Sequence, residues 1–99
     1  MKSQKDTPAL QDAEATAVAI LGWLAGEPEL LSRFLALTGV APSEVRHAVG
    51  DPGFLAGLVD FLMEHEPTLL AFSAATGVTP EAVVRAHAVL SGPAGDDDF

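Results

Sequence analysis

The chain has 99 residues, of which 48% are hydrophobic, and it contains no cysteine. This length and composition favour one globular domain with its own core, and they exclude disulfides, thiol catalysis and cysteine-ligated metal. The formal net charge of −9, from 14 acidic and 5 basic residues, repels phosphate backbones and anionic membrane surfaces, so nucleic-acid and peripheral-membrane binding are disfavoured.

Both ends of the chain are polar. Residues 1–7 lack periodicity and residues 93–99 contain three consecutive aspartates, so we expect disordered tails there and a single helical domain over 8–92. No apolar segment of signal-peptide type follows the first tail directly. The most apolar run nearby, residues 15–25, is shorter than the ~20 residues that span a bilayer. We therefore expect a cytoplasmic protein.

The first two helices are predicted from apolar residues at i, i+3 and i+4 spacing. One helix runs from about residue 9 to 25, and its buried stripe is Ala13, Ala17, Ile20, Leu21 and Leu24. Gly26 ends it, and Pro28 suits the first turn of a second helix that runs to about Thr38. The residues expected to be buried there are Leu30, Leu31, Phe34 and Leu35, with Leu37 as an additional candidate.

A short third helix is predicted over residues 42–49, and its inward residues are Val45, Ala48 and Val49. Gly50 stops it. Asp51 then offers an N-cap side chain before Pro52, which starts a fourth helix that runs to about Glu64. The wide apolar set of this helix is typical of the most buried helix of a bundle. Its members are Phe54, Leu55, Leu58, Val59, Phe61, Leu62 and Met63.

The fifth and sixth helices complete the prediction. Residues 68–76 form the fifth, with a buried set of Leu69, Leu70, Phe72 and Ala75. Thr79 is a good N-cap before Pro80, where the sixth helix begins and runs to about Ser91. Its apolar set is Val83, Val84, Ala88, Val89 and Leu90. The sequence therefore predicts an all-α fold, a compact bundle of about six short helices.

One stretch occurs twice, as Thr-Gly-Val-Ala-Pro at 38–42 and Thr-Gly-Val-Thr-Pro at 76–80, with a separation of 38 residues. In each copy the glycine can end a helix in the left-handed conformation, and the proline fits the first turn of the next helix. At the same offset, apolar residues of the first helices correspond to those of the fourth and fifth. We predict two copies of a three-helix unit, over 9–50 and 52–91. The alternative is that helical hairpins reuse the same stop and start residues by convergence.

The chain has three histidines, His47, His65 and His87, which are candidates for chemistry. In Glu64-His65-Glu66, a histidine flanked by carboxylates could ligate a metal or relay a proton, but consecutive helical residues do not face one another, and a solvated loop is favoured. His87 lies on an apolar face, where we expect a core histidine that donates to a backbone carbonyl. His47 is expected at the surface or half-buried. The three are too dispersed for a metal-binding spacing, so we expect no catalytic residue, cofactor or metal site.

Segment 34–46 has the helix, glycine-containing turn and second helix of a helix-turn-helix, and its second copy does as well. A recognition helix needs basic or amide side chains to meet phosphates and base edges. The two candidate helices offer only Arg46, His47 and Arg85, and the chain has no asparagine. DNA binding is therefore an alternative rather than the favoured function.

Trp23 is the residue to consider for partner binding. Its helix already has a full apolar stripe, so Trp23 either completes the core, which we favour, or anchors a partner. Met63 adds apolar surface, and Trp23 and Met63 are the candidate partner-binding residues. Gly22 and Gly57 lie inside helices, where glycine costs about 1 kcal/mol relative to alanine. We expect that another helix packs closely against each of them.

Four short motifs carry a family resemblance: Gly22-Trp23-Leu24-Ala25, Pro28-Glu29-Leu30-Leu31, Arg33-Phe34-Leu35 and Thr38-Gly39. In them the chain resembles a family of small bacterial proteins known only as "domain of unknown function 3572", and the similarity covers roughly residues 13 to 91. The resemblance implies a compact helical protein of about this length. It implies no reaction, cofactor or catalytic residue.

The favoured function is a non-enzymatic interaction module, an acidic helical bundle that binds a protein partner or itself. The first alternative is a degenerate helix-turn-helix regulator acting on DNA. A second is a hydrolytic or metal-dependent enzyme using the Glu64-His65-Glu66 corner. No small-molecule ligand can be identified from the sequence.

Overall fold

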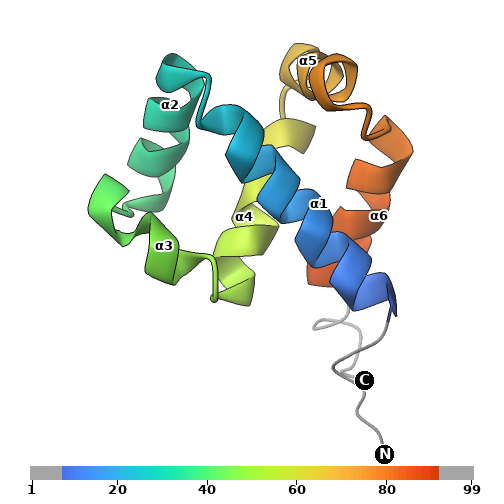
Figure 1. Cartoon of the computed structure of the whole chain (residues 1–99), viewed down its shortest axis with the longest axis horizontal. Coiled ribbons are helices and arrows are strands. Elements are labelled where there is room, and N and C mark those ends of the chain that lie inside the picture. Colours follow the sequence, from blue (N-terminus) through green and yellow to red (C-terminus); the bar gives the residue numbers. More distant parts are fainter. Residues whose placement is uncertain (1–7, 92–99) are drawn as a thin grey trace, which may run out of the picture.

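Six α-helices and one short 3-10 turn make up most of residues 8–91, the part of the chain that the computed structural model describes. They are α1 (Pro8–Leu24), α2 (Pro28–Thr38), η2 (Pro42–Glu44, the 3-10 turn), α3 (Val45–Ala48), α4 (Pro52–Met63), α5 (Glu66–Thr76) and α6 (Pro80–Ser91). In Figure 1, α1 crosses the front of α4, with α2 and α3 on one side and α5 and α6 on the other. The all-α prediction is confirmed. The tails predicted at 1–7 and 93–99 lie outside the described residues.

Two helices begin at side-chain caps that the sequence predicted. The Oδ1 atom of Asp51 accepts the backbone N–H of Gly53 at 2.9 Å, and the Oγ1 atom of Thr79 accepts that of Ala82 at 3.1 Å. Each bond satisfies an N–H group that has no partner within the helix, a contribution of about 1 kcal/mol. The caps fix the starts of α4 and α6, so both predicted starts are confirmed.

The repeated stretch forms the same local structure twice. Gly39 and Gly77 have φ angles of 77° and 84°, the left-handed conformation that glycine adopts without a Cβ penalty. In both turns the preceding threonine donates to a carbonyl of the last helical turn and accepts the N–H two residues further on. These bonds are Thr38 Oγ1 to Leu35 O (3.1 Å), Val40 N to Thr38 Oγ1 (3.2 Å), Thr76 Oγ1 to Phe72 O (2.8 Å) and Val78 N to Thr76 Oγ1 (3.1 Å).

Three edge-on aromatic contacts join the two halves of the chain, namely Trp23–Phe72, Phe34–Phe61 and Phe34–Phe54, and the first two correspond to each other. The rings of Trp23 on α1 and Phe72 on α5 lie 5.7 Å apart, and those of Phe61 on α4 and Phe34 on α2 lie 5.4 Å apart. Trp23 and Phe61 are separated by 38 residues, as are Phe34 and Phe72. Moving both residues of one contact to their equivalents in the other half gives the other contact. Two units related by a two-fold axis meet in this way. A duplication would produce this exchange, and the two copies over 9–50 and 52–91 stay a prediction.

The third helices of the two halves differ. The helix α6 has 12 residues and packs along α1 and α4. Its counterpart begins as the 3-10 turn η2 and continues as the four-residue α3, which has no fully buried residue. The continuous helix predicted over 42–49 is thus wrong in its first three residues. The chain must leave this helix at Gly50 so that Asp51 can cap α4, which leaves room for only a short helix.

The buried set is narrower than the sequence predicted. Leu37 is 70% exposed, and several other residues assigned to the core also face solvent, namely Leu70, Ala75, Val84 and Ala88. Each outer helix of a small bundle buries one stripe, and these side chains lie beyond its edge. Ala86, absent from the predicted core, is buried. The core residues are Ala13, Ala17, Ile20, Leu24, Phe34, Leu35, Phe54, Leu55, Leu58, Val59, Leu62, Phe72, Val83 and Ala86.

The explanation expected for the helix-interior glycines is not supported. A Cβ atom at Gly22 would meet no atom within 4 Å, and one at Gly57 would meet only the Cε1 atom of Phe34, at 4.0 Å. Neither position therefore requires glycine for close packing. Among the helices of residues 8–91, none is both long and apolar enough to cross a membrane.

Candidate functional site

His87 pairs with a carboxylate instead of lying in the core. Its Nε2 atom is 2.8 Å from Oδ1 of Asp60, and the two side chains are 36% and 52% exposed. The expected bond from a buried His87 to a backbone carbonyl is therefore wrong. The reason is the packing of α6 on α4, which brings together two residues that are far apart in the sequence. A contact between two side chains this exposed contributes at most about 1 kcal/mol.

The Glu64-His65-Glu66 corner lies between α4 and the first turn of α5, and all three residues are exposed. The Nδ1 atom of His65 is 2.6 Å from Oγ1 of Thr68, a buried residue of that first turn. This hydrogen bond between side chains connects His65 to the first turn of α5. Within the part of the chain that the structure describes, no group of three or more His, Asp or Glu residues is arranged to hold a metal ion.

Trp23 is half-buried and packs on the core, edge-on to Phe72. This is the arrangement that the sequence favoured for it. Met63, at the end of α4, is 36% exposed. The role of Trp23 and Met63 in partner binding stays a prediction.

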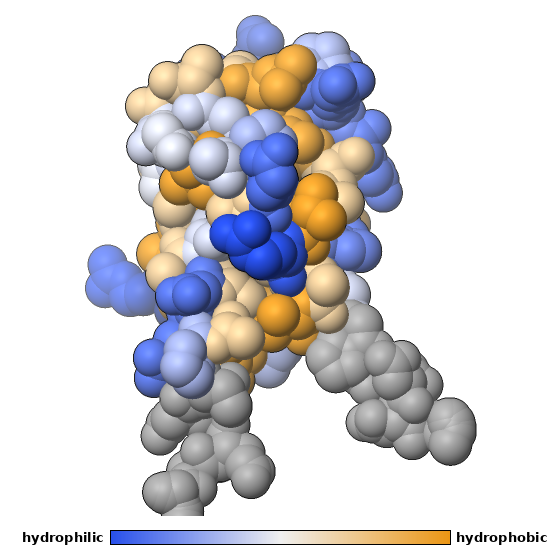
Figure 2. All heavy atoms as spheres, turned by 90° about the vertical axis from the view of Figure 1, so that its right-hand side faces the viewer, coloured by the Kyte–Doolittle hydropathy of each residue, from blue (hydrophilic) through white to orange (hydrophobic). Residues whose placement is uncertain are grey.

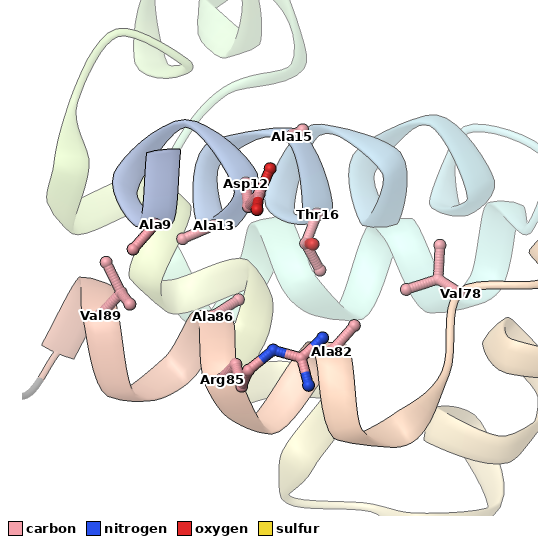
Figure 3. A pocket seen from close by; sticks show the side chains of 10 residues that line it. All are labelled: Ala9, Asp12, Ala13, Ala15, Thr16, Val78, Ala82, Arg85, Ala86 and Val89. Carbon is pink, nitrogen blue, oxygen red and sulfur yellow. The ribbon is translucent and has the colours of Figure 1, made fainter. Parts of the chain in front are cut away.

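A pocket of about 650 Å³ lies between the first half of α1 and α6 (Figure 3). Most of its lining is small and apolar: Ala9, Ala13, Ala15, Ala82 and Ala86 with Val78 and Val89. Three polar side chains join them, Asp12 and Thr16 from α1 and Arg85 from α6 (Figure 3). Asp12 and Arg85 are both exposed. We interpret this pocket as the seam where small residues let two helices approach.

The helix-turn-helix alternative has a partial structural basis. α5, the turn at Gly77 and α6 follow one another in the required order, and Arg85 is exposed on α6. In the first half the second helix is only η2 and α3, where Arg46 and His47 are exposed. DNA binding stays the disfavoured alternative that it was from the sequence.

A second hollow, which we call the α2 groove, runs along one face of α2 and has a volume of about 620 Å³. None of its lining residues is charged, and only Ser32 carries a polar side chain. They are Ala25, Pro28, Leu31, Ser32, Leu35, Ala36, Gly39, Val40, Ala41 and Pro42. The groove is therefore an apolar surface in a chain of which 19% of the residues are charged.

One helix and the turn after it form the α2 groove. Positions 28, 31, 32, 35, 36 and 39 recur at helical spacing, so they share one face of α2. The small side chains of Ser32 and Ala36 leave this face open, and the left-handed Gly39 turns the chain so that residues 40–42 also line it. Leu31 and Leu35 were predicted to be buried, and Leu35 is. The groove was not predicted, although the uncharged face of α2 could have indicated it.

The opposite side of the molecule has a different surface. Figure 2 faces the α5 and α6 side, and hydrophobic atoms there lie in separate patches between hydrophilic ones. Leu70 on α5 and Val84 on α6 are each half exposed. The α2 groove, with ten adjoining uncharged residues, is the stronger candidate for binding.

Comparison with known proteins gives a family and nothing beyond it. A family model described as "Protein of unknown function (DUF3572)" matches residues 10–93. No curated protein and no solved structure matches the chain. The matched range contains both repeated turns and the α2 groove.

Proposed function

The chain belongs to the DUF3572 family, whose members are described as proteins of unknown function, and we propose that it is a non-enzymatic interaction module. The α2 groove accepts an apolar segment of a protein partner. The observation that carries this proposal is the uncharged lining of the groove along the full length of α2.

The chemistry of the groove favours contact over catalysis. Its lining offers mainly leucine, valine, alanine and proline side chains, and the one polar side chain, Ser32, has no acid or base among the lining residues to activate its hydroxyl. Burying apolar surface contributes roughly 25 cal/mol per Å². An apolar face along a helix is also a recurring site for a partner helix. Binding at the groove would therefore rest on apolar contact.

The test uses a matched pair of variants. Ala36→Arg places a long charged side chain in the groove, whereas Ala74→Arg places the same side chain at the position 38 residues later, on α5. Both alanines are exposed, so both variants should fold. Tagged wild type and variants are crosslinked in the native cell, and the proteins that co-purify are quantified by mass spectrometry.

We expect a stoichiometric partner with wild type and with Ala74→Arg, and at least tenfold less of it with Ala36→Arg. Equal recovery of every co-purifying protein from all three would refute the proposed function, because the groove would then play no part in any capture.

A further inference from the structure

We infer that the occupant of the α2 groove is a basic amphipathic helix of a partner protein. This inference rests on the function proposed above, because it takes the groove to be the binding surface. It adds the conformation and the charge of the segment that binds there. Three properties of the groove carry it: the backbone that surrounds it, its length and the charges at its ends.

The backbone around the groove offers little to an extended segment. α2 uses its own N–H and C=O groups within the helix, so an extended peptide laid along it would find no strand edge to pair with. A polyproline segment docks between aromatic side chains, and the lining contains none. A helix satisfies its own backbone and presents only side chains. It is therefore the conformation that fits.

The length of the groove suits a helix of about three turns. α2 has 11 residues, which corresponds to roughly 16 Å at 1.5 Å per residue. Lining residues occur from Pro28 at its start to Gly39 just past its end. A partner helix with apolar residues at i, i+3, i+4 and i+7 would therefore meet apolar surface along its whole length.

Acidic residues lie near both ends of the groove. Glu27 and Glu29 adjoin a lining proline at the start of α2. At the other end, Glu44 and Asp51 line a smaller hollow that shares Val40 with the groove. All four carboxylates are exposed. Basic residues on the polar face of a bound helix would meet them, which favours association and fixes orientation.

The basic groups nearby are fewer. Arg33 is the single Lys or Arg of α2, Arg46 is exposed on α3, and His47 lies in the same hollow as Glu44. The whole chain carries a net charge of −9, which attracts a basic segment and repels a second copy of this chain. The charge distribution therefore selects a basic helix of another protein over self-association.

The experiment measures binding of a fluorescein-labelled synthetic peptide built from repeated Leu-Lys-Lys-Leu-Leu-Lys-Leu heptads. The control peptide has glutamate in place of every lysine. Fluorescence anisotropy is recorded with the full chain, with Ala36→Arg and with Ala74→Arg, which add the same charge at different places. We expect the lysine peptide to bind wild type and Ala74→Arg within twofold of one another. Ala36→Arg should weaken it at least tenfold, and the glutamate peptide should bind at least tenfold more weakly to wild type.

Several results would overturn the inference. Equal affinity of the lysine peptide for both variants would mean that its binding depends on the net charge of the protein and not on the groove. Equal affinity of the two peptides for wild type would remove the role of charge. A wild-type dimer in size-exclusion chromatography that Ala36→Arg dissolves and Ala74→Arg retains would identify a second copy as the occupant. If Ala36→Arg fails to fold by circular dichroism, Ser32→Arg, at an exposed lining position, replaces it.

The outcome in the native cell separates this inference from the proposed function. If Ala36→Arg loses a native partner but the lysine peptide does not bind the groove, the interaction module stands and the basic helix is wrong. If the native partner is retained by Ala36→Arg, the proposed function itself fails.

Discussion

Gly22 illustrates how a single residue can be suboptimal for stability. It lies inside α1, is exposed, and has open space where a Cβ atom would be. Gly22→Ala should therefore raise the free energy of unfolding by about 1 kcal/mol, since alanine loses less backbone entropy in a helix. That corresponds to a rise in Tm of about 4–8 °C for a domain of this size. Thermal denaturation followed by circular dichroism measures it, and an unchanged or lower Tm would contradict the prediction.

Gly39 is the opposite case, because its conformation needs glycine. Its φ angle is 77°. An alanine held in this left-handed conformation would have its Cβ atom too close to the following carbonyl oxygen, at a cost of about 1–2 kcal/mol. Gly39→Ala should lower the urea midpoint of unfolding without a change in m value, and Gly77→Ala, with φ at 84°, should do so to a similar extent. A large difference between the two variants would show that the repeated turns are not energetically equivalent.

Trp23 and Met63 can be separated by their effects on stability and on binding. Trp23→Ala removes a half-buried ring that contacts Phe72. It should therefore cost about 3 kcal/mol, at the low end of the range for a large aromatic side chain. Met63→Ser changes an exposed position and should alter stability by less than about 0.5 kcal/mol. Chemical denaturation measures both values. A loss of native partners on Met63→Ser, at unchanged stability, would support Met63 as an anchor.

At the level of helices, the last helix of each half differs in length and in packing. α6 is long enough to pack along α1 and α4, whereas η2 and α3 end after a few residues. The side chains are similar in kind, since each segment carries arginine and histidine among apolar residues. α3 is short because α4 begins at Pro52, ten residues after the start of η2 at Pro42, whereas α6 continues for 12 residues from Pro80.

The exposed Arg46 and Arg85 allow a direct test of the DNA-binding alternative. We expect no retardation of mixed-sequence duplex DNA in a gel at low salt. The net charge of −9 opposes association with phosphates, and the two candidate recognition helices carry one arginine each. Retardation that decreases with salt and is lost in Arg85→Ala would support the helix-turn-helix interpretation instead.

At the scale of the whole molecule, the two halves depend on one another. The aromatic contacts run between halves, from Trp23 to Phe72 and from Phe61 to Phe34, and α1 packs along α6. A fragment ending at Gly50 should therefore lack cooperative thermal unfolding, because its α1 has lost the partners that bury it. Circular dichroism of the fragment measures this. A sigmoidal transition like that of the full chain would show that one three-helix unit is stable by itself.

Local features were predictable because they depend on residues close together in the chain. The caps of Asp51 and Thr79 and the turns at Gly39 and Gly77 are made by hydrogen bonds that reach no more than four residues. Helix starts, helix ends and the all-α class follow from such bonds and from apolar periodicity. The family resemblance was also visible in short motifs, and the match over residues 10–93 confirms it.

How these helices face one another could be seen only in the folded molecule. In the structure His87 contacts Asp60, and Leu70 and Val84 are half exposed to solvent. The α2 groove, which Leu35 helps to line, is also visible only there. Periodicity marks which residues of a helix are apolar, but the width of the buried stripe depends on how many neighbours pack on it. Contacts between α4 and α6, or between α2 and the turn after it, are set by packing angles that no local pattern encodes. The predicted helices therefore agree with the structure except at residues 42–44, which form a 3-10 turn, and at the start of α5, which lies at Glu66 instead of Thr68. The candidate site emerged only from the arrangement of the helices.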